Sequence, residues 1–355
     1  MLFRSIPAMT VMRNCASGME SIAAAQQRLR AGEGEVFLVG GTESMSNFPL
    51  MMGPDLVKFF TRLGKARSLL QRLRALAGFR FRSLKPRLAI MEGLTDQTTG
   101  LMMGNTAENV ARQFGITRAQ MDAFALQSHQ RAAAAQAAKR FAAEVTPYVP
   151  PPDYRGALLQ DDGVRSEQTL EALARLRPVF DRQNGDVTVG NSCQITDGAV
   201  AMLCMSAKKA KSLGLEPLAI VRGHAVAALS PATMGLGPVH ATPKALERAN
   251  VQMKDLDLVE INEAFAAQVL GCQRAFASDD YCRKHLGLPG ALGELDPARL
   301  NVNGGAIALG HPIAATGARL LLTLAHELRR RGGRYGLATL CIGGGQGQAV
   351  VLEAA

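Results

Sequence analysis

Short apolar runs of strand length alternate with longer apolar runs of helical periodicity along most of the chain. The strand-like runs occupy residues 8–12, 35–39, 199–205, 219–226 and 256–261, and the helical runs occupy residues 18–31, 109–144 and 242–250. Glycine-rich turns end several runs, and a proline-rich loop is expected at 145–163. Thr117 followed by Gln120 resembles a capping box and predicts the start of a helix. Strand and helix in alternation predict a layered α/β fold.

One α/β unit occurs twice in the sequence. In the first copy, residues 15–18 precede a helical run and then a strand closed by Gly40-Gly41. In the second copy, residues 311–317 precede the same succession, which ends at Gly343-Gly344. Two copies facing each other would bring the beginnings of their helices to one shared cleft. The repeat therefore predicts two similar α/β domains with a site between the helix starts.

Bulk properties narrow the class of protein. With 355 residues, of which 47% are hydrophobic, the chain can bury a core for two domains or for one large one. Its six cysteines form no Cys-x-x-Cys pair, which favours reduced thiols in a cytoplasm-like compartment. No apolar stretch reaches the roughly 18 residues of a membrane span. Residues 1–7 are slightly basic, but cleavage there would cut into the strand before Cys15, so we expect no targeting peptide.

The net charge of +10 is concentrated in one segment. Residues 51–91 hold ten basic residues against one acid, Asp55, inside an insertion at about 48–100. Apolar residues recur there with helical spacing, at Leu63, Leu69, Leu70, Leu73, Leu76 and Ala77. A cationic amphipathic helix suits an anionic membrane surface or an acyl-chain tunnel, whereas a solvated variable loop is the simpler alternative. Because the charge is so confined and no binding motif accompanies it, we expect no nucleic-acid partner.

Two cysteines and one histidine lie in glycine-rich turns next to apolar runs, namely Cys15, His311 and Cys341. These are the residue types that thiol-based acyl transfer requires. One thiol attacks the substrate, an imidazole removes the proton of that thiol, and a second acid/base protonates the leaving group. Cys15 precedes an expected helix, where the positive end of the helix dipole favours a thiolate. The other histidines lack such surroundings, and His129 and His326 are read as solvated residues on helices.

Four motifs together resemble the thiolases, which cleave 3-ketoacyl-CoA with CoA or condense two acyl-CoA molecules. They are Asn14-Cys-Ala-Ser-Gly18, Asn262-Glu-Ala-Phe265, Asn303-Gly-Gly305 with Gly310-His-Pro312, and Cys341-Ile-Gly-Gly-Gly345. The resemblance covers almost the whole chain in the family's order. It implies two similar mixed-sheet α/β domains in a five-layered αβαβα arrangement. The N-terminal domain is expected at 1–207 and the C-terminal domain at 208–355.

The resemblance also assigns roles to individual residues. Cys15 matches the nucleophile that accepts the acyl group, and His311 matches its base and a donor of the first oxyanion hole. Cys341 matches the acid/base that protonates the departing enolate and deprotonates the incoming thiol. Gly343, with the Cys15 N–H, matches the second oxyanion hole, and Asn262 matches the residue that fixes a water in the first. For Glu263 and Phe265, a role limited to packing and to anchoring the loop is the alternative to a catalytic role.

Two departures from the family pattern stand out. Cys193, followed by Gln194, occupies the position near the pantetheine of CoA where the family usually has serine. Thiolases also have a strand-helix-strand-helix unit before the strand that leads to the nucleophile, whereas this sequence begins just upstream of Cys15. We therefore expect either a start site further upstream or a truncated chain.

The expected activity is that of a 3-ketoacyl-CoA thiolase of fatty-acid β-oxidation, working through an acyl-Cys15 intermediate. A biosynthetic acetoacetyl-CoA thiolase and an inactive, truncated thiolase-like subunit are the alternatives. No permanently bound cofactor or metal is expected, since CoA is a substrate. The expected partners are acyl-CoA, CoA, further copies of the chain, and a β-oxidation α-subunit or anionic membrane that meets residues 51–91. The expected location is the cytoplasm, with peripheral attachment to a membrane as an option.

Overall fold

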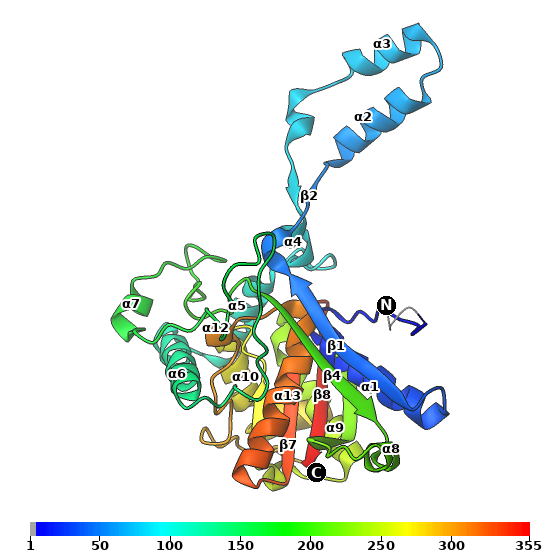
Figure 1. Ribbon diagram of the computed structural model, residues 1–355. Coiled ribbons are helices and arrows are strands. Elements are labelled where there is room, and N and C mark those ends of the chain that lie inside the picture. The colour runs from blue at the N-terminus through cyan, green and yellow to red at the C-terminus, as the bar shows by residue number, and fades with distance from the viewer. Residues whose placement is uncertain (1–4) are drawn as a thin grey trace.

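The computed structural model of the protein describes residues 5–355. The body of the protein is layered, with two long helices sandwiched between two sheets and further helices behind the larger sheet (Figure 1). The expectation about a targeting peptide at 1–7 falls partly on residues 1–4, which lie outside the described residues. Across residues 5–355, no helix is both long and apolar enough to cross a bilayer.

The larger sheet belongs to the C-terminal half and has the strand order β5-β8-β7-β6. The strands are β5 (Ala219–Ala228), β6 (Leu258–Ile261), β7 (Tyr335–Ile342) and β8 (Gln346–Ala354). The sheet is mixed, because β6 and β7 are parallel while β8 is antiparallel to both β5 and β7. Alternate residues of β8 face opposite layers. Val350 and Leu352 pack toward helices α1 (Ser17–Ala31) and α13 (Ile313–Arg331), whereas Ala349 and Val351 pack toward helices α9 (Gly237–Ala249) and α10 (Ala266–Phe276).

Helices α1 (Ser17–Ala31) and α13 (Ile313–Arg331) form the layer between the sheets. They lie very close near their N-terminal ends, where a Cβ on Gly18 would be 2.8 Å from the Ala314 carbonyl oxygen and one on Gly317 would be 2.6 Å from the Met19 nitrogen. Both helices end at a glycine in the left-handed region, Gly32 and Gly332. The repeat of helix and strand predicted from sequence is thus confirmed, with both helix starts side by side.

The smaller sheet is the antiparallel pair β1 (Val36–Ser44) and β4 (Asp197–Met205). Gly40 and Gly41 do not close β1, as the sequence suggested, but lie inside it. A Cβ on Gly40 would collide with the Val200 carbonyl and one on Gly41 with the Ala314 carbonyl, so the strand needs glycine where it approaches β4 and α13. The outer face of the pair leaves large apolar side chains exposed, including Leu38 and Leu203.

The strand expected at 8–12 is wrong. Residues 7–13 have no regular structure, and within residues 5–355 no strand pairs with them, since the smaller sheet consists of β1 and β4. Met9 and Met12 are accordingly exposed. The 3₁₀ turn η1 (Asn14–Ala16) leads from this segment directly into α1.

Further helices pack behind and beside the larger sheet. They include α5 (Met103–Phe114), α6 (Arg118–Ala137), α7 (Leu170–Ala174), α9 (Gly237–Ala249) and α10 (Ala266–Phe276). The capping box predicted at Thr117 is present at the start of α6. The helix ends at Ala137 and not near 144, and the proline-rich stretch that follows is a loop, as predicted.

Residues 50–88 project from the body as an arm (Figure 1). Its base is the strand pair β2 (Leu50–Met51) and β3 (Arg87–Leu88), and its length is formed by α2 (Pro54–Lys65) and α3 (Leu69–Ala77). The single amphipathic helix predicted over 63–77 is therefore wrong: the chain turns at 66–68, and Ser68 begins α3 with a capping box to Gln71.

Short elements complete the chain. They are η2 (Met45–Asn47), η3 (Phe81–Leu84), α4 (Ala89–Gly93), α8 (Ala207–Ser212), η4 (Pro231–Leu236), η5 (Met253–Asp255), α11 (Asp279–Tyr281), the π-helical turn η6 (Cys282–Leu286) and α12 (Ala306–Leu309).

Candidate active site

The nucleophile candidate lies in a turn held in place by several hydrogen bonds. Asn14 has a positive φ of 46°, and its amide donates to the Gly343 carbonyl at 2.9 Å. Arg13, on the other side of the turn, donates to Glu20 at 2.8 Å and to Gln346 at 3.0 Å. The loop before α1 is thereby tied to the turn between β7 and β8, which places Cys15 beside Gly343.

The Cys15 thiol is a neutral group at rest. Burial raises its pKa above the ordinary value, although hydrogen bonds from the backbone N–H groups of Gly343 and of Cys15 itself act in the opposite direction. Burial therefore opposes the preference for a thiolate that is expected at a helix start, whereas the two N–H donors support it. A base is needed to remove the proton.

His311 is buried immediately before α13, and its imidazole is held at both nitrogens. Nδ1 lies 2.6 Å from Thr316 Oγ1, and Nε2 lies 3.4 Å from the side-chain nitrogen of Asn262. Burial, helped by the nearby Arg319 cation, lowers the pKa of His311 to about 3. The imidazole is therefore neutral at physiological pH, as a base must be.

The tautomer of His311 follows from the bonds of Thr316. The Thr316 hydroxyl donates its single proton to the Pro312 carbonyl at 3.0 Å, so toward the imidazole it can only accept. Nδ1 therefore carries the ring proton, and Nε2 presents a lone pair on the side of Asn262. That lone pair, 3.4 Å from the Asn262 amide nitrogen, can accept a proton.

Asn262 follows β6 and is also buried. Its backbone N–H donates to the Thr339 carbonyl of β7 at 3.0 Å, which fixes the residue at the end of the parallel strand pair. Within the described part of the chain, its side-chain oxygen has no hydrogen-bond partner although it is buried. Such an atom is suited to hold a water or a substrate group.

Cys341 and Gly343 lie at the end of β7 and in the turn after it. Cys341 is buried, and its thiol pKa is raised well above the ordinary value, first by burial and then by the neighbouring Cys15, Cys272 and Cys193. Gly344 and Gly345 have positive φ angles of 92° and 82°, which turns the backbone sharply after Gly343. The second thiol and the Gly343 N–H are thereby held on one rigid hairpin.

Cys193 lies close to the same thiols. Its N–H donates to the Ala264 carbonyl at 3.0 Å, next to Asn262, and burial together with Cys15 raises its pKa to about 12. It is an inert neutral thiol under ordinary conditions. All six cysteines of the chain are free.

The structure brings together the residues singled out from sequence and adds two that were missed. Thr316 and Arg319 both act on the His311 loop, and the signal that could have found them is their position within the first two turns of the helix after His311. His129 was misjudged: it is buried and accepts the Arg165 N–H at 3.1 Å, because α6 packs this face beneath the following loop.

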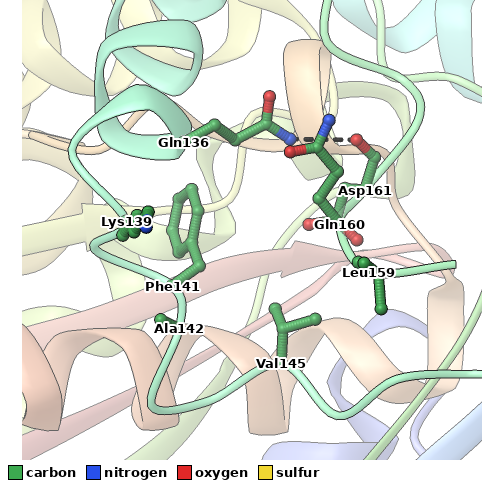
Figure 2. A pocket seen from close by; sticks show the side chains of 8 residues that line it. All are labelled: Gln136, Lys139, Phe141, Ala142, Val145, Leu159, Gln160 and Asp161. Carbon is green, nitrogen blue, oxygen red and sulfur yellow. Dashed lines mark hydrogen bonds between the residues drawn. The ribbon is translucent and has the colours of Figure 1, made fainter.

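A separate pocket of about 240 Å³ lies between the end of α6 and the loop after it. Figure 2 shows Phe141 on one side and Leu159 on the other, with the Gln136 side chain donating to the Asp161 carbonyl. None of the residues assigned to the acyl-transfer site lines it. We therefore assign this pocket no part in the chemistry.

Two helix starts that converge on a thiol, an imidazole and a second thiol define a protein of the thiol-dependent acyltransferase class. The chain belongs to the thiolase family: the description "Thiolase, N-terminal domain" matches residues 2–208, and "Thiolase, C-terminal domain" matches residues 215–354. It is an acyltransferase of that family.

Similar proteins carry the same activity in their names. The 3-ketoacyl-CoA thiolase of Pectobacterium atrosepticum is 46% identical over 98% of this chain and 78% of its own, and that of Yersinia pestis is 45% identical over 98% and 79%. Human mitochondrial 3-ketoacyl-CoA thiolase in complex with CoA superposes with a TM-score of 0.83, at 38% identity, over all of this chain and 80% of its own. The Bacillus anthracis acetyl-CoA acetyltransferase superposes with a TM-score of 0.81 at 37% sequence identity, and the match covers 97% of this chain and 78% of that one.

Proposed function

We propose that the protein cleaves 3-ketoacyl-CoA with CoA in two half-reactions that share Cys15. The observation that carries the proposal is that the Asn14 amide donates to the Gly343 carbonyl at 2.9 Å, which holds the turn with the Cys15 sulfur against the hairpin that contains Cys341. A site of this kind can stabilise negative charge on an acyl group bound to that sulfur.

In the first half-reaction, His311 Nε2 takes the proton from the Cys15 thiol, and the thiolate attacks the 3-keto carbon. The developing oxyanion is stabilised by the Nε2–H of His311 and by a water held on Asn262. The bond between C2 and C3 then breaks, leaving an acyl thioester on Cys15. Cys341 gives its proton to the departing enolate, and acetyl-CoA leaves.

In the second half-reaction, the Cys341 thiolate takes the proton from the thiol of incoming CoA. The CoA thiolate attacks the acyl-Cys15 carbonyl, whose oxyanion meets the N–H groups of Cys15 and Gly343. Collapse releases the shortened acyl-CoA, and the Cys15 thiolate recovers its proton from His311. Protons and electron pairs balance over the cycle, so the protein needs no resident cofactor or metal. Cys193 is a neutral neighbour that we place against the pantetheine of CoA.

The test compares acyl adducts in two variants. Cys15→Ser should show no adduct and no thiolysis, because a hydroxyl is far less ionised than a thiol. Cys341→Ser should still accept an acyl group on Cys15 while turnover collapses. Intact-mass spectra after mixing with a 3-ketoacyl-CoA measure both, and Cys204→Ser, on the remote strand β4, is the matched control. Full turnover in Cys15→Ser would overturn the proposal, and absence of the adduct in Cys341→Ser would overturn the division of roles.

We also propose that the arm, residues 50–88, attaches the protein to an anionic membrane surface and favours longer acyl chains. Phe59 packs against Phe79 with ring centroids 5.0 Å apart, which fastens α2 to the segment after α3. The apolar side chains on the outside stay exposed, Leu69 by 74%, Leu73 by 54% and Phe81 by 83%. Basic residues flank them, so the arm combines apolar anchors with positive charge, as interfacial helices do.

Other expectations are proposed on the same footing. A β-oxidation α-subunit is the alternative partner of the arm. With either partner, we propose that the protein works in the cytoplasm as a homo-oligomer. We place the boundary between the two domains at 207/208. In the five-layered αβαβα arrangement, helices would cover the outer face of β1 and β4, where Leu38 and Leu203 are exposed.

A further inference from the structure

The short helix α12 ends at Leu309, and residues 310 and 311 follow it directly. Its direction therefore sets where the His311 imidazole lies. A helix of four residues has almost no internal hydrogen bonds, so its orphan N–H and C=O groups must be satisfied from outside. The structure shows how this is done at both ends.

The N-terminal end of α12 is held by Glu263. Its carboxylate accepts from the Ile307 N–H at 3.3 Å, from the Ser128 hydroxyl at 2.5 Å and from the Asn301 amide at 2.9 Å. Ser128 in turn accepts from the Gly305 N–H at 3.1 Å. Glu263 is buried and follows Asn262 directly, so one dipeptide supplies both an oxyanion-site residue and the anchor of α12.

The C-terminal end of α12 is held by Arg319. Its guanidinium donates to the Gly310 carbonyl at 2.7 Å. Gly310 itself has a φ of 85°, and a side chain there would collide with Thr196, whose hydroxyl accepts the His311 N–H at 3.3 Å. The peptide between Gly310 and His311 is thus held from both sides, by Arg319 at its oxygen and by Thr196 at its nitrogen.

We propose that Arg319 is a positioning residue for the acylation step, which orients the His311 imidazole by holding the Gly310 carbonyl, with Glu263 fixing the opposite end of α12. This inference rests on the proposed function. Arg319 touches none of the reacting atoms, so it acts through the geometry of the loop and through its charge, which helps to lower the pKa of His311. Its planar guanidinium suits this task, because the N–H groups of a guanidinium point in fixed directions, whereas the donors of a lysine ammonium rotate freely.

The first test is the rate at which Cys15 is acylated in Arg319→Met. We expect a loss of about 10- to 100-fold in that rate and in kcat, because small displacements of a catalytic group have effects of this size. The KM values for acyl-CoA and CoA should stay close to those of the wild type. Arg329→Met is the matched control, since Arg329 lies on the same helix and pairs with Glu216 at the surface.

A second readout reports the imidazole itself. In protein labelled with ¹⁵N-histidine, the His311 signals of the wild type should show a proton on Nδ1, as its bond to Thr316 requires. Arg319→Met should shift or broaden these signals, whereas Arg329→Met should leave them unchanged. A role confined to stability would lower the melting temperature without this change.

The outcomes separate the two proposals. If the wild type forms no acyl adduct on Cys15, the proposed function fails. If Arg319→Met forms the acyl adduct as fast as Arg329→Met, and the imidazole signals of His311 are unchanged, the positioning role fails. Should Arg319→Met not fold, Arg319→Lys decides, because it keeps the positive charge but loses the fixed direction of the donor. It should acylate several-fold more slowly than Arg329→Lys, and equal rates would overturn the proposal.

Discussion

One hydroxyl group decides which nitrogen of His311 carries the proton. Thr316 accepts from Nδ1 because its own proton is committed to the Pro312 carbonyl. Thr316→Val has nearly the same shape but no acceptor, so it leaves the buried Nδ1–H unsatisfied and releases the ring to rotate or change tautomer. We expect kcat to fall by about 10- to 100-fold, a loss typical of removing the partner that orients a functional histidine.

A matched control for Thr316→Val lies two turns further along the same helix. Thr323→Val also removes a hydroxyl from α13, but that hydroxyl donates to Glu144 at 2.7 Å and is remote from the imidazole. In steady-state thiolysis, Thr316→Val should therefore be slower than Thr323→Val. Equal rates would show that Thr316 contributes only to the packing of α13.

Glu144 provides a prediction about stability and pH. Burial raises its pKa from the ordinary 4.5 to about 7, although the hydrogen bond from Thr323 opposes the shift. The folded protein thus keeps a proton that the unfolded chain releases above pH 4.5, so this group costs stability increasingly as the pH rises to 7. Glu144→Gln mimics the protonated acid and should be about 2 kcal/mol more stable than the wild type at pH 8.

The measurement is urea unfolding of both proteins across the pH range. The difference in unfolding free energy should narrow steadily toward pH 5, where the wild-type carboxyl is protonated in the folded state. Glu216→Gln, which changes an exposed surface carboxylate in the same way, is the control. A difference that is constant with pH would contradict the raised pKa.

At this scale the sequence indicates candidate reacting groups but not the residues that support them. Cys15, His311 and Cys341 are recognisable because their glycine-rich turns are local in sequence. Thr316 and Arg319 lie within the first two turns after His311, but their position alone does not show that their side chains turn back to bond its loop. Nor does the sequence show that burial raises the pKa of the Cys15 thiol, because it shows the helix start but not the depth of burial.

At the scale of elements, the contact between α1 and α13 positions the site. Gly18 and Gly317 let the two helices touch within a few residues of Cys15 and His311. In Gly18→Ala the new methyl group would meet Ala314 and Ala318 backbone atoms at 2.8 Å, so the helices must move apart. We expect a loss of about 1–3 kcal/mol in unfolding free energy, as for other overpacked sites, together with reduced acylation of Cys15.

Gly64→Ala is the control for this prediction. Gly64 lies inside α2, and a Cβ there would have no neighbour within 4 Å. The substitution should be neutral or slightly stabilising, because alanine favours helix over glycine. Thermal unfolding of both variants tests the comparison. If the stability and the acylation rate of Gly18→Ala equal those of the wild type, the helices can separate without cost to the site.

Elements were predictable where their signals are local. The capping box at Thr117 and the terminal glycines of α1 and α13 are examples, and the internal repeat correctly placed both helix starts together. The errors arose where tertiary contacts decide. Gly40 and Gly41 read as a strand end but permit close approach within β1, and the helix predicted over 63–77 is divided because Ser68 begins a new helix at the tip of the arm.

At the scale of the whole molecule, charge and shape coincide. The sequence places ten of the chain's basic residues within 51–91, and the structure shows that this stretch leaves the layered body as the arm (Figure 1). Periodicity alone could not show the projection, since an amphipathic pattern fits a helix packed on a core equally well. Only the exposure of residues such as Leu69 and Phe81 distinguishes the two.

The paired base of the arm allows it to be removed cleanly. Because Met51 pairs with Arg87, residues 52–86 can be replaced by Asn-Gly, which joins two antiparallel strands as a tight hairpin. The shortened protein should keep its melting temperature and its activity on acetoacetyl-CoA, since the arm lies outside the layered body. It should lose binding to phosphatidylglycerol vesicles in a sedimentation assay and lose activity on long-chain 3-ketoacyl-CoA.

Two further variants separate charge from apolar anchoring. Leu69→Ser with Leu73→Ser removes exposed anchors and keeps every charge, so some binding should survive at low salt and vanish at high salt, where attraction between charges is screened. Arg72→Gln with Arg74→Gln keeps the anchors and should weaken binding to anionic vesicles at low salt. If vesicle binding and the chain-length profile survive the Asn-Gly replacement unchanged, the arm is a solvated loop; if the wild-type arm ignores vesicles but binds a β-oxidation α-subunit, the partner is that protein.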